Sequence, residues 1–421
     1  MDAQGVRLRR DVAWNLVPVA LLAIVGLGMN FMIGRWWGAD ALGAFNLVTP
    51  AFFAFAVLGA GGIQFSVLRA IAEDPDDEDR VATVVVGALL PAVVLALAAT
   101  GLCIALAAPI GALVKNADVE TGLWWVAPGL FCFAVNKVLF GVVNGLRRMR
   151  AFAVYTSLRY VLIAVGIVLA HIWNAPADHL AVIWTFTEGT LLVVLLCELL
   201  STVQLRRARG WWAWAKRHID YGSRGLLATL SFEINSKIDV WMLGVALPES
   251  LVGIYALAST LFEGAAQLGV VVQNNVNPMI ARDLALGKRV DVDGLVKRTR
   301  RWFVPAMIAA CIASIFIYPF AIPTLVGDPA FHAGTTSFAI LMVGLALTTP
   351  WLPFNQVLLM GSRPGWHTVY VCAVFGVSVA GNLLLIPHLA LEGAALSTAI
   401  ATVFSAALLR VLARWQTGVR L

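Results

Sequence analysis

The chain has 421 residues, of which 60% are hydrophobic and only 13% are charged. Soluble domains are about 45–50% apolar and about 25% charged, so this composition excludes an ordinary soluble protein. The net charge of +6 at pH 7 does not indicate a nucleic-acid-binding protein, because the Lys and Arg residues follow a membrane topology and do not form one basic patch.

Long runs of apolar residues predict membrane-spanning helices, because about 20 such residues cross the hydrocarbon core. The first run follows Arg7, Arg9 and Arg10, as in a signal peptide, but its length and the hydrophobic run after it favour an uncleaved helix. Turns and charge clusters separate twelve predicted spans, at 12–33, 42–68, 81–107, 122–145, 151–172, 180–203, 225–246, 251–278, 302–325, 333–360, 366–386 and 392–413. We therefore predict an all-α polytopic membrane protein.

The basic residues are distributed unequally between the two sides of these spans. The loops on one side and the two chain ends hold 25 of the 30 Lys and Arg residues, and the opposite loops hold only Arg35 and Lys115. Short loops rich in Lys and Arg stay in the cytoplasm. Both termini are therefore predicted to be cytoplasmic, and three cations, Lys137, Arg159 and Lys237, are left inside predicted helices.

The chain divides into two similar halves, residues 1–203 and 225–421, joined by a predicted cytoplasmic linker at 204–224. The linker contains the basic, Trp-rich stretch RARGWWAWAKRH, which suits either the membrane interface or a plain connection. Shifting the chain by 210 residues aligns similar or identical residues, among them Gly34 with Gly244, Gly43 with Gly253 and Leu47 with Leu257. The halves start on the same side, so we predict two pseudo-symmetric six-helix bundles around a central cavity.

The predicted seventh helix carries three ionisable residues, Glu233, Lys237 and Asp239. Each ionised side chain at bilayer depth costs at least about 2.5–3.5 kcal/mol, so such residues mark an aqueous cavity or a specific partner. Glu233 and Lys237 are four residues apart and can form a purely structural pair. That alternative leaves Asp239 unexplained.

Lys137 and Arg159 lie at matched depth on helices joined by a tight loop, so their charges repel unless an anion lies between them. Glu188 and Glu263 are the acids on other helices that can pair with them. We predict that Lys137, Arg159 and Lys237 line a cationic lumen that binds a phosphate or an acidic sugar. The acids Glu188, Glu233, Asp239 and Glu263 are assigned to pairing or to coupling with H⁺ or Na⁺. The alternative is that the long cationic side chains reach backbone groups or the membrane interface.

Several motifs resemble those of one transporter family. They are the pattern Asp239-x4-Gly244-x8-Gly253-x-Tyr255-x-x-Ala258, the loop NGLRRMRAFAVY at 144–155, LLMGSRPGWHTVY at 358–370 and GNLLLIPHLALEGAALSTAIA at 381–401. With twelve helices in two parallel halves, the chain resembles the lipid-linked oligosaccharide flippases, the O-antigen and polysaccharide transporters of the multidrug/oligosaccharidyl-lipid/polysaccharide superfamily.

The resemblance implies that the protein moves an undecaprenyl-pyrophosphate-linked glycan from the cytoplasmic to the outer leaflet of a bacterial inner membrane by alternating access. It implies a transporter without cofactor or enzymatic activity, acting as a monomer or with polysaccharide assembly proteins. One departure is that the first predicted helix carries no charge, so the first half has no counterpart of Asp239.

Two other functions fit parts of the sequence. A multidrug exporter of the same superfamily is the first alternative, although exporters of cationic compounds favour an acidic cavity. A membrane prenyltransferase is the second, because EDPDDEDR at 73–80 resembles an Asp-rich magnesium site, but no second such motif is present in the sequence. The five cysteines and six histidines are scattered, so we expect no metal site or catalytic cluster.

Overall fold

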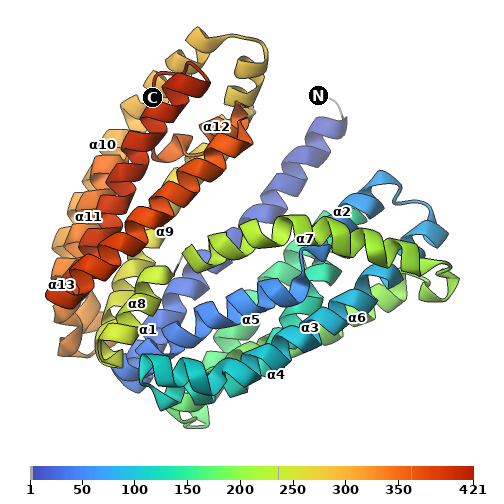
Figure 1. Cartoon of the computed structure of the whole chain (residues 1–421), viewed down its shortest axis with the longest axis horizontal. Coiled ribbons are helices and arrows are strands. Elements are labelled where there is room, and N and C mark those ends of the chain that lie inside the picture. Colours follow the sequence, from blue (N-terminus) through green and yellow to red (C-terminus); the bar gives the residue numbers. More distant parts are fainter. Residues whose placement is uncertain (1–2, 236, 362) are drawn as a thin grey trace. The chain divides into compact units, whose positions relative to one another are not determined.

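The computed structural model describes residues 3–235, 237–361 and 363–421, and within these residues it is all-helical and contains no strand (Figure 1). The predicted all-α class is therefore confirmed. The α-helices are α1 Ala3–Ala60, α2 Ile63–Glu73, α3 Glu78–Val114, α4 Ala117–Gly145, α5 Met149–Ile172, α6 Val182–Thr202, α7 Trp211–Asn235, α8 Ile238–Ala246, α9 Glu249–Ala285, α10 Arg289–Val326, α11 Thr335–Thr348, α12 Val357–Met360 and α13 Pro364–Gln416. Short 3₁₀ helices occur at Ala177–His179, Leu205–Arg207, Pro329–Gly334 and Leu352–Phe354.

In the described part of the chain, nine helical segments are long and apolar enough to cross a membrane. The number is lower than the twelve predicted spans partly because α1 and α13 each run through two of them. Each is interrupted by one non-helical residue, Gly38 (φ 89°) in α1 and Ala390 (φ 50°) in α13. Both interruptions fall in predicted loops, so the long helices are each two spans joined at a sharp bend.

Three other predicted spans are divided in the structure, and one of them, 333–360, is shared by α11, the 3₁₀ helix Leu352–Phe354 and α12. The predicted span 42–68 is interrupted where α1 ends and α2 begins, at Gly61 (φ 58°) and Gly62 (φ 71°). Glycine adopts this left-handed conformation without the steric cost that a Cβ imposes. The predicted span 225–246 is divided between α7, which ends at Asn235, and α8, which begins at Ile238. The helix α7 begins at Trp211, inside the predicted linker.

The chain forms two compact units. The N-terminal unit consists of Met1–Trp37 and Ala44–Lys237, and the C-terminal unit of Gly38–Gly43 and Ile238–Leu421. Residues 225–237 thus group with the N-terminal unit, whereas the sequence analysis assigns them to the second half. In the N-terminal unit, α4 packs against α2, α3 and α6, and in the C-terminal unit α11 packs against α9, α10 and α13.

Glycines allow two close backbone contacts. In the C-terminal unit, Gly43 and Gly253, which are equivalent in the 210-residue repeat, pack against each other: a Cβ on Gly43 would lie 2.0 Å from the Glu249 carbonyl oxygen, and a Cβ on Gly253 would lie 2.1 Å from that of Ala39. In the N-terminal unit, α7 contacts the turn between α1 and α2 through Gly222, whose Cβ would lie 2.1 Å from the Gly61 carbonyl oxygen.

The substitution Gly222→Ala is expected to lower the free energy of unfolding by about 1–3 kcal/mol, because the added methyl group meets rigid backbone and overpacking has costs of this size. Thermal unfolding of the purified protein measures the change. Gly189→Ala in α6 is the matched control, since nothing lies within 4 Å of its added Cβ. Equal melting temperatures for the two variants would show that α7 does not need this close contact.

The packed face of α7 also buries His218. Its Nδ1 lies 2.8 Å from the Ser66 hydroxyl and its Nε2 lies 3.3 Å from the Val84 carbonyl oxygen. These partners fit a neutral imidazole that donates from Nε2 and accepts at Nδ1. Burial lowers the pKa of His218 from 6.5 to about 4, because a charged ring would lose its hydration.

The depressed pKa of His218 predicts a pH dependence of stability. Between pH 6.5 and about 4 the unfolded chain binds a proton at this residue and the folded chain does not, so the free energy of unfolding falls as the pH is lowered through this window. The loss approaches about 3 kcal/mol near pH 4, at 1.36 kcal/mol per pKa unit. Unfolding measured at pH 7 and pH 4.5 for the natural protein and for His218→Gln tests this, because the variant lacks the titrating group. An identical pH dependence in both proteins would contradict the assignment.

Candidate functional site

An ion pair joins α5 to α6 inside the membrane-spanning part of the N-terminal unit. The Nε atom of Arg159 lies 2.7 Å from Oε1 of Glu188, and Nη2 donates a hydrogen bond to Oε2 at 3.1 Å. The Glu188 side chain is fully buried, and 16% of the Arg159 side chain is exposed. Of the two acids that the sequence suggested for this role, the structure therefore pairs Glu188 with Arg159.

Asn136 on α4 extends this pair into a network. Its Nδ2 donates to Oε2 of Glu188 at 2.9 Å and to the Glu188 backbone carbonyl at 3.0 Å. A buried carboxylate is tolerated when opposite charge and hydrogen bonds together replace its hydration. Three helices, α4, α5 and α6, are thus joined by one polar cluster at membrane depth.

Aromatic rings lie beside Arg159 and beside Lys137, a second cation, on α4. The Arg159 guanidinium carbon lies 4.8 Å from the ring centroid of Phe133 and 5.1 Å from that of Phe140. The Lys137 ammonium lies 5.1 Å from the Phe133 centroid. Cations attracted to ring faces gain about 0.5–2 kcal/mol each, which offsets part of the cost of burial.

Lys137 differs from Arg159 in how its charge is balanced. Among the residues that the structure describes, no acid lies within 4 Å of its ammonium group. It interacts at longer range with Glu233 and Glu188, and Arg159 repels it. Since Glu188 is already bonded to Arg159 and Asn136, Lys137 keeps the capacity to pair closely with an additional anion.

Two of the three ionisable residues of the predicted seventh helix, Glu233 and Lys237, lie near the end of the N-terminal unit. Glu233 is on the last turn of α7, and Lys237 follows the helix in a turn. The helical spacing behind the predicted Glu233–Lys237 pair does not apply, because α7 ends at Asn235. Both side chains have interaction partners in the structure.

Asp239 lies in the C-terminal unit, in the first turn of α8, and is buried. Its Oδ2 accepts a hydrogen bond from the Tyr255 hydroxyl on α9 at 2.7 Å, and its Oδ1 accepts from the Val240 amide at 2.9 Å. Thr398 on α13 hydrogen bonds to the same Tyr255 hydroxyl. This contact explains why an aspartate and a tyrosine occur together in the motif: they join α8 to α9 and α13.

Two further polar groups belong to the C-terminal unit. Glu263 on α9 is half-buried and accepts a long hydrogen bond, 3.4 Å, from Ser259 one turn earlier. Asn382 on α13 is fully buried, and neither polar atom of its side chain has a hydrogen-bond partner among the described residues. Its neighbour Gly381 packs against Ser397 in the second part of α13.

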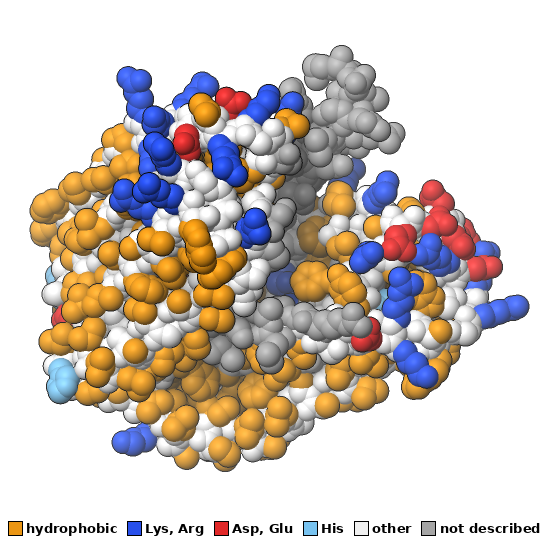
Figure 2. Space-filling model, turned by 45° about the horizontal axis from the view of Figure 1, so that its top comes forward, with side chains coloured by type: hydrophobic (Ala, Val, Ile, Leu, Met, Phe, Trp, Pro, Cys, Tyr) orange, Lys and Arg blue, Asp and Glu red, His pale blue; other side chains and the backbone are white. Residues whose placement is uncertain are grey.

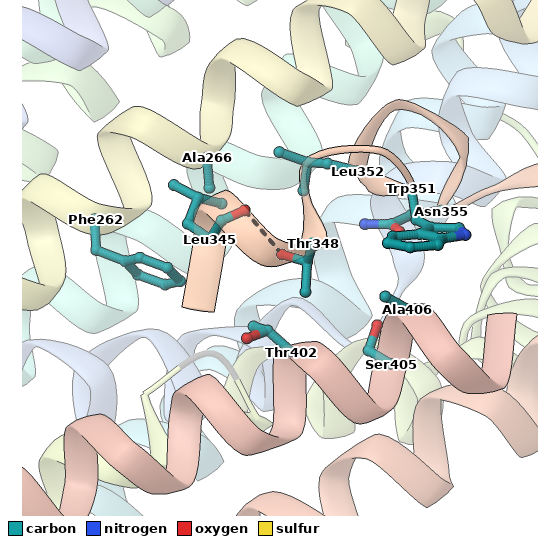
Figure 3. Close-up of a pocket in the computed structure, with 10 residues that line it drawn as sticks. All are labelled: Phe262, Ala266, Leu345, Thr348, Trp351, Leu352, Asn355, Thr402, Ser405 and Ala406. Atoms are coloured by element: carbon teal, nitrogen blue, oxygen red, sulfur yellow. Dashed lines mark hydrogen bonds between the residues drawn. The ribbon is translucent and has the colours of Figure 1, made fainter. Parts of the chain in front are cut away.

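A small cavity of about 90 Å³ lies among α9, α11 and α13 (Figure 3). Its hydroxyl groups are already bonded within the unit. Thr348 donates to Gly344 and Leu345, Thr402 donates to Ala399, and Ser405 lies 2.5 Å from the Tyr370 hydroxyl. None of the site residues predicted from the sequence lines this cavity.

Sequence reasoning missed Asn136, Tyr255 as the partner of Asp239, and Asn382. A polar amide inside an apolar run is the signal that marks Asn136 and Asn382, since buried amides require partners. Within 3–235, 237–361 and 363–421, no group of three or more His, Cys, Asp or Glu side chains is arranged to hold a metal ion.

The chain matches the family model described as polysaccharide biosynthesis protein over residues 8–282. Among solved structures, the lipid II flippase MurJ is 12% identical, with a TM-score of 0.78 over 96% of this chain and 87% of that one. A multidrug resistance transporter of the MATE family in the MOP superfamily is 14% identical, with a TM-score of 0.79 over 96% and 98%. The MATE transporter VcmN of Vibrio cholerae is 12% identical, with a TM-score of 0.60 over 96% of each chain. No curated protein sequence matches the chain.

Proposed function

Because this chain belongs to the polysaccharide biosynthesis protein family, we propose that it is a flippase that moves a lipid-linked oligosaccharide across a bacterial inner membrane. Its fold is that of the MOP-superfamily transporters, as the resemblance in sequence predicted. The proposed substrate is an undecaprenyl-pyrophosphate-linked glycan, carried from the cytoplasmic to the outer leaflet by alternating access. Both termini are proposed to be cytoplasmic, and no enzymatic step is proposed.

The observation that supports this function is the charged cluster at membrane depth. Arg159 is neutralised by Glu188, whereas Lys137 beside it has no close acid among the described residues. A pyrophosphate supplies the missing negative charge, and lysine binds phosphate as a point charge. We assign Lys137 to the pyrophosphate, Lys237 to a supporting contact, and Arg159 to holding α5 and α6 beside the site.

The proposed cationic residues all lie in the N-terminal unit, whereas Asp239 and Glu263 lie in the C-terminal unit. We propose that Asp239 binds the coupling ion, H⁺ or Na⁺. The unsatisfied amide of Asn382 supports this proposal, because it adds a second buried polar group to the same unit.

The substitution Asp239→Asn is expected to reduce ion-driven transport at least tenfold and to remove its dependence on the ion gradient, since the neutral amide cannot exchange a charge. The amide oxygen can still accept the Val240 hydrogen bond, and the amide nitrogen can donate to the Tyr255 hydroxyl, so the fold is expected to be retained. Tyr255→Phe is the control, because it removes the hydrogen bonds of the Tyr255 hydroxyl to Asp239 and Thr398 and leaves the carboxylate. Unchanged ion dependence in Asp239→Asn would exclude this residue from coupling.

Flipping is tested with the purified full chain in proteoliposomes that contain a fluorescent prenyl-pyrophosphate oligosaccharide. A membrane-impermeant quencher reports the fraction of substrate in the outer leaflet. We expect flipping to depend on the protein and on the attached glycan. Absence of flipping by folded protein, together with uptake of a fluorescent organic cation, would instead identify a multidrug exporter, whose fold is equally similar. Magnesium-dependent incorporation of labelled prenyl diphosphate would identify a prenyltransferase.

A further inference from the structure

Three arginines near the end of α13 line a cavity of about 240 Å³ in the C-terminal unit: Arg410, Arg414 and Arg420. All three are exposed, and in the described part of the chain none has a carboxylate within 4 Å of its guanidinium. The residues that follow α13 are anchored to α10, because the Asp293 side chain accepts a hydrogen bond from the Arg420 backbone amide at 3.0 Å. Figure 2 shows Lys and Arg side chains gathered at one end of this unit, next to a broad hydrophobic surface.

A fourth arginine contributes to the same positive region. Arg300 on α10 donates from Nε to the Pro350 carbonyl at 2.7 Å and lies over the Trp351 ring. Its Nη2 atom is buried without a hydrogen-bond partner among the described residues, and its charge is close enough to that of Arg410 for the two to repel. A buried donor without an acceptor beside a second cation is the arrangement that an anion would stabilise.

An open apolar groove of about 660 Å³ lies between α11 and α13 of the same unit. Exposed aliphatic side chains form its rim, including Val343 and Leu347 on α11 and Ile400 and Val403 on α13. Gly344 deepens it, because α11 and α13 approach closely there, at Ala399. The lining is almost wholly apolar, so the groove fits a hydrocarbon chain and not a polar ligand.

The groove and the arginines lie on one face of α13. At 100° per residue, Arg410 and Arg414 follow Val403 by seven and eleven residues and so point within about 20° of its direction. Val403 lies near the end of the groove that is closer to the arginines, and at 1.5 Å per residue Arg410 and Arg414 lie about 10 and 16 Å beyond it along the helix. One leaflet is about 15 Å deep, half of the ~30 Å hydrocarbon core. The groove and the cationic cavity are therefore spaced like the chain and the headgroup of a lipid.

Aromatic residues mark the headgroup level at the same end of α13. Trp415 is next to Arg414 and is exposed, and its ring packs edge-on against Trp366, with 4.7 Å between centroids. Exposed tryptophans concentrate where hydrocarbon meets the headgroups. The arginines thus lie at the depth where lipid phosphates occur.

We propose that this face of the C-terminal unit binds an anionic phospholipid, with its phosphate among Arg410, Arg414 and Arg300 and one acyl chain in the groove between α11 and α13. Charge complementarity selects the anionic headgroup, and the groove selects a lipid over a free phosphate. This site is separate in sequence and unit from Lys137, to which we assign the transported pyrophosphate.

The test uses the purified full chain in detergent and follows its thermal unfolding with added phosphatidylglycerol, phosphatidylcholine or inorganic phosphate. Phosphatidylglycerol is expected to raise the melting temperature, with little effect of the other two. In the double variant Arg410→Gln, Arg414→Gln the concentration needed should rise about 30-fold, because each basic residue near anionic lipid contributes about a factor of five. The matched control is Arg282→Gln, Lys288→Gln, which removes two exposed charges of the same unit and should change nothing.

The variant Val403→Trp, which fills the groove and keeps every arginine, should also weaken the effect of phosphatidylglycerol. It provides an independent test if the double arginine variant does not fold. The proposal is overturned if the arginine variant responds like the natural protein or if inorganic phosphate reproduces the shift. Displacement of phosphatidylglycerol by an equimolar prenyl diphosphate would also overturn it, because the occupant would then be the transported lipid.

Discussion

Glu188→Gln is expected to lower the free energy of unfolding by about 3–5 kcal/mol, because it leaves the Arg159 guanidinium without its counter-charge in a buried site. Thermal or denaturant unfolding of the purified protein measures this. The double variant Arg159→Gln, Glu188→Gln should recover much of the loss, since it removes both charges. Together with the single variant Arg159→Gln, these variants complete a double-mutant cycle, which gives the coupling energy of the pair.

The control for this prediction is Glu78→Gln, which breaks an exposed pair with Arg207 in the same unit. Exposed pairs contribute at most about 1 kcal/mol, so this variant should unfold almost as the natural protein does. If Glu188→Gln lowers the free energy of unfolding by less than about 1 kcal/mol, water reaches the Arg159–Glu188 pair and the pair is not buried as the structure indicates.

Lys137→Ala is expected to lower the rate of lipid-linked glycan flipping by about 10- to 150-fold at limiting substrate, the factor that corresponds to one charge-assisted hydrogen bond of about 1.5–3 kcal/mol. The fold should persist, because no close ion pair among the described residues depends on Lys137. The same proteoliposome assay with the fluorescent pyrophosphate-linked glycan provides the measurement.

Two comparisons sharpen the Lys137 prediction. Lys137→Arg keeps the charge and should retain more activity than alanine, and Lys297→Ala removes an exposed lysine of the other unit and should have no effect. Normal flipping by a well-folded Lys137→Ala protein would exclude this residue from substrate binding. Equal losses in Lys137→Ala and Lys297→Ala would indicate a general effect of surface charge.

The sequence was sufficient for the fold class because the bilayer imposes few solutions on the chain. Backbone groups in hydrocarbon must be bonded internally, so long apolar runs form helices. The bends at Gly38 and Ala390 fall where the sequence predicted loops. The predicted linker was the weak point: α7 extends through it from Trp211 to Asn235, because one face of this polar helix packs against α2 and α3.

The sequence by itself determined that this chain is an all-helical protein with long apolar spans, and it predicted which ionisable residues interrupt those spans, because hydropathy and charge are properties of the residues alone. Only the tertiary structure decided that Glu188 forms an ion pair with Arg159, that Asn136 donates a hydrogen bond to Glu188, and that Asp239 accepts one from Tyr255. Partners 16 to 52 residues apart in the chain meet through helix packing, and the direction in which each side chain points follows from the rotation of its helix against its neighbours, which spacing in sequence does not specify.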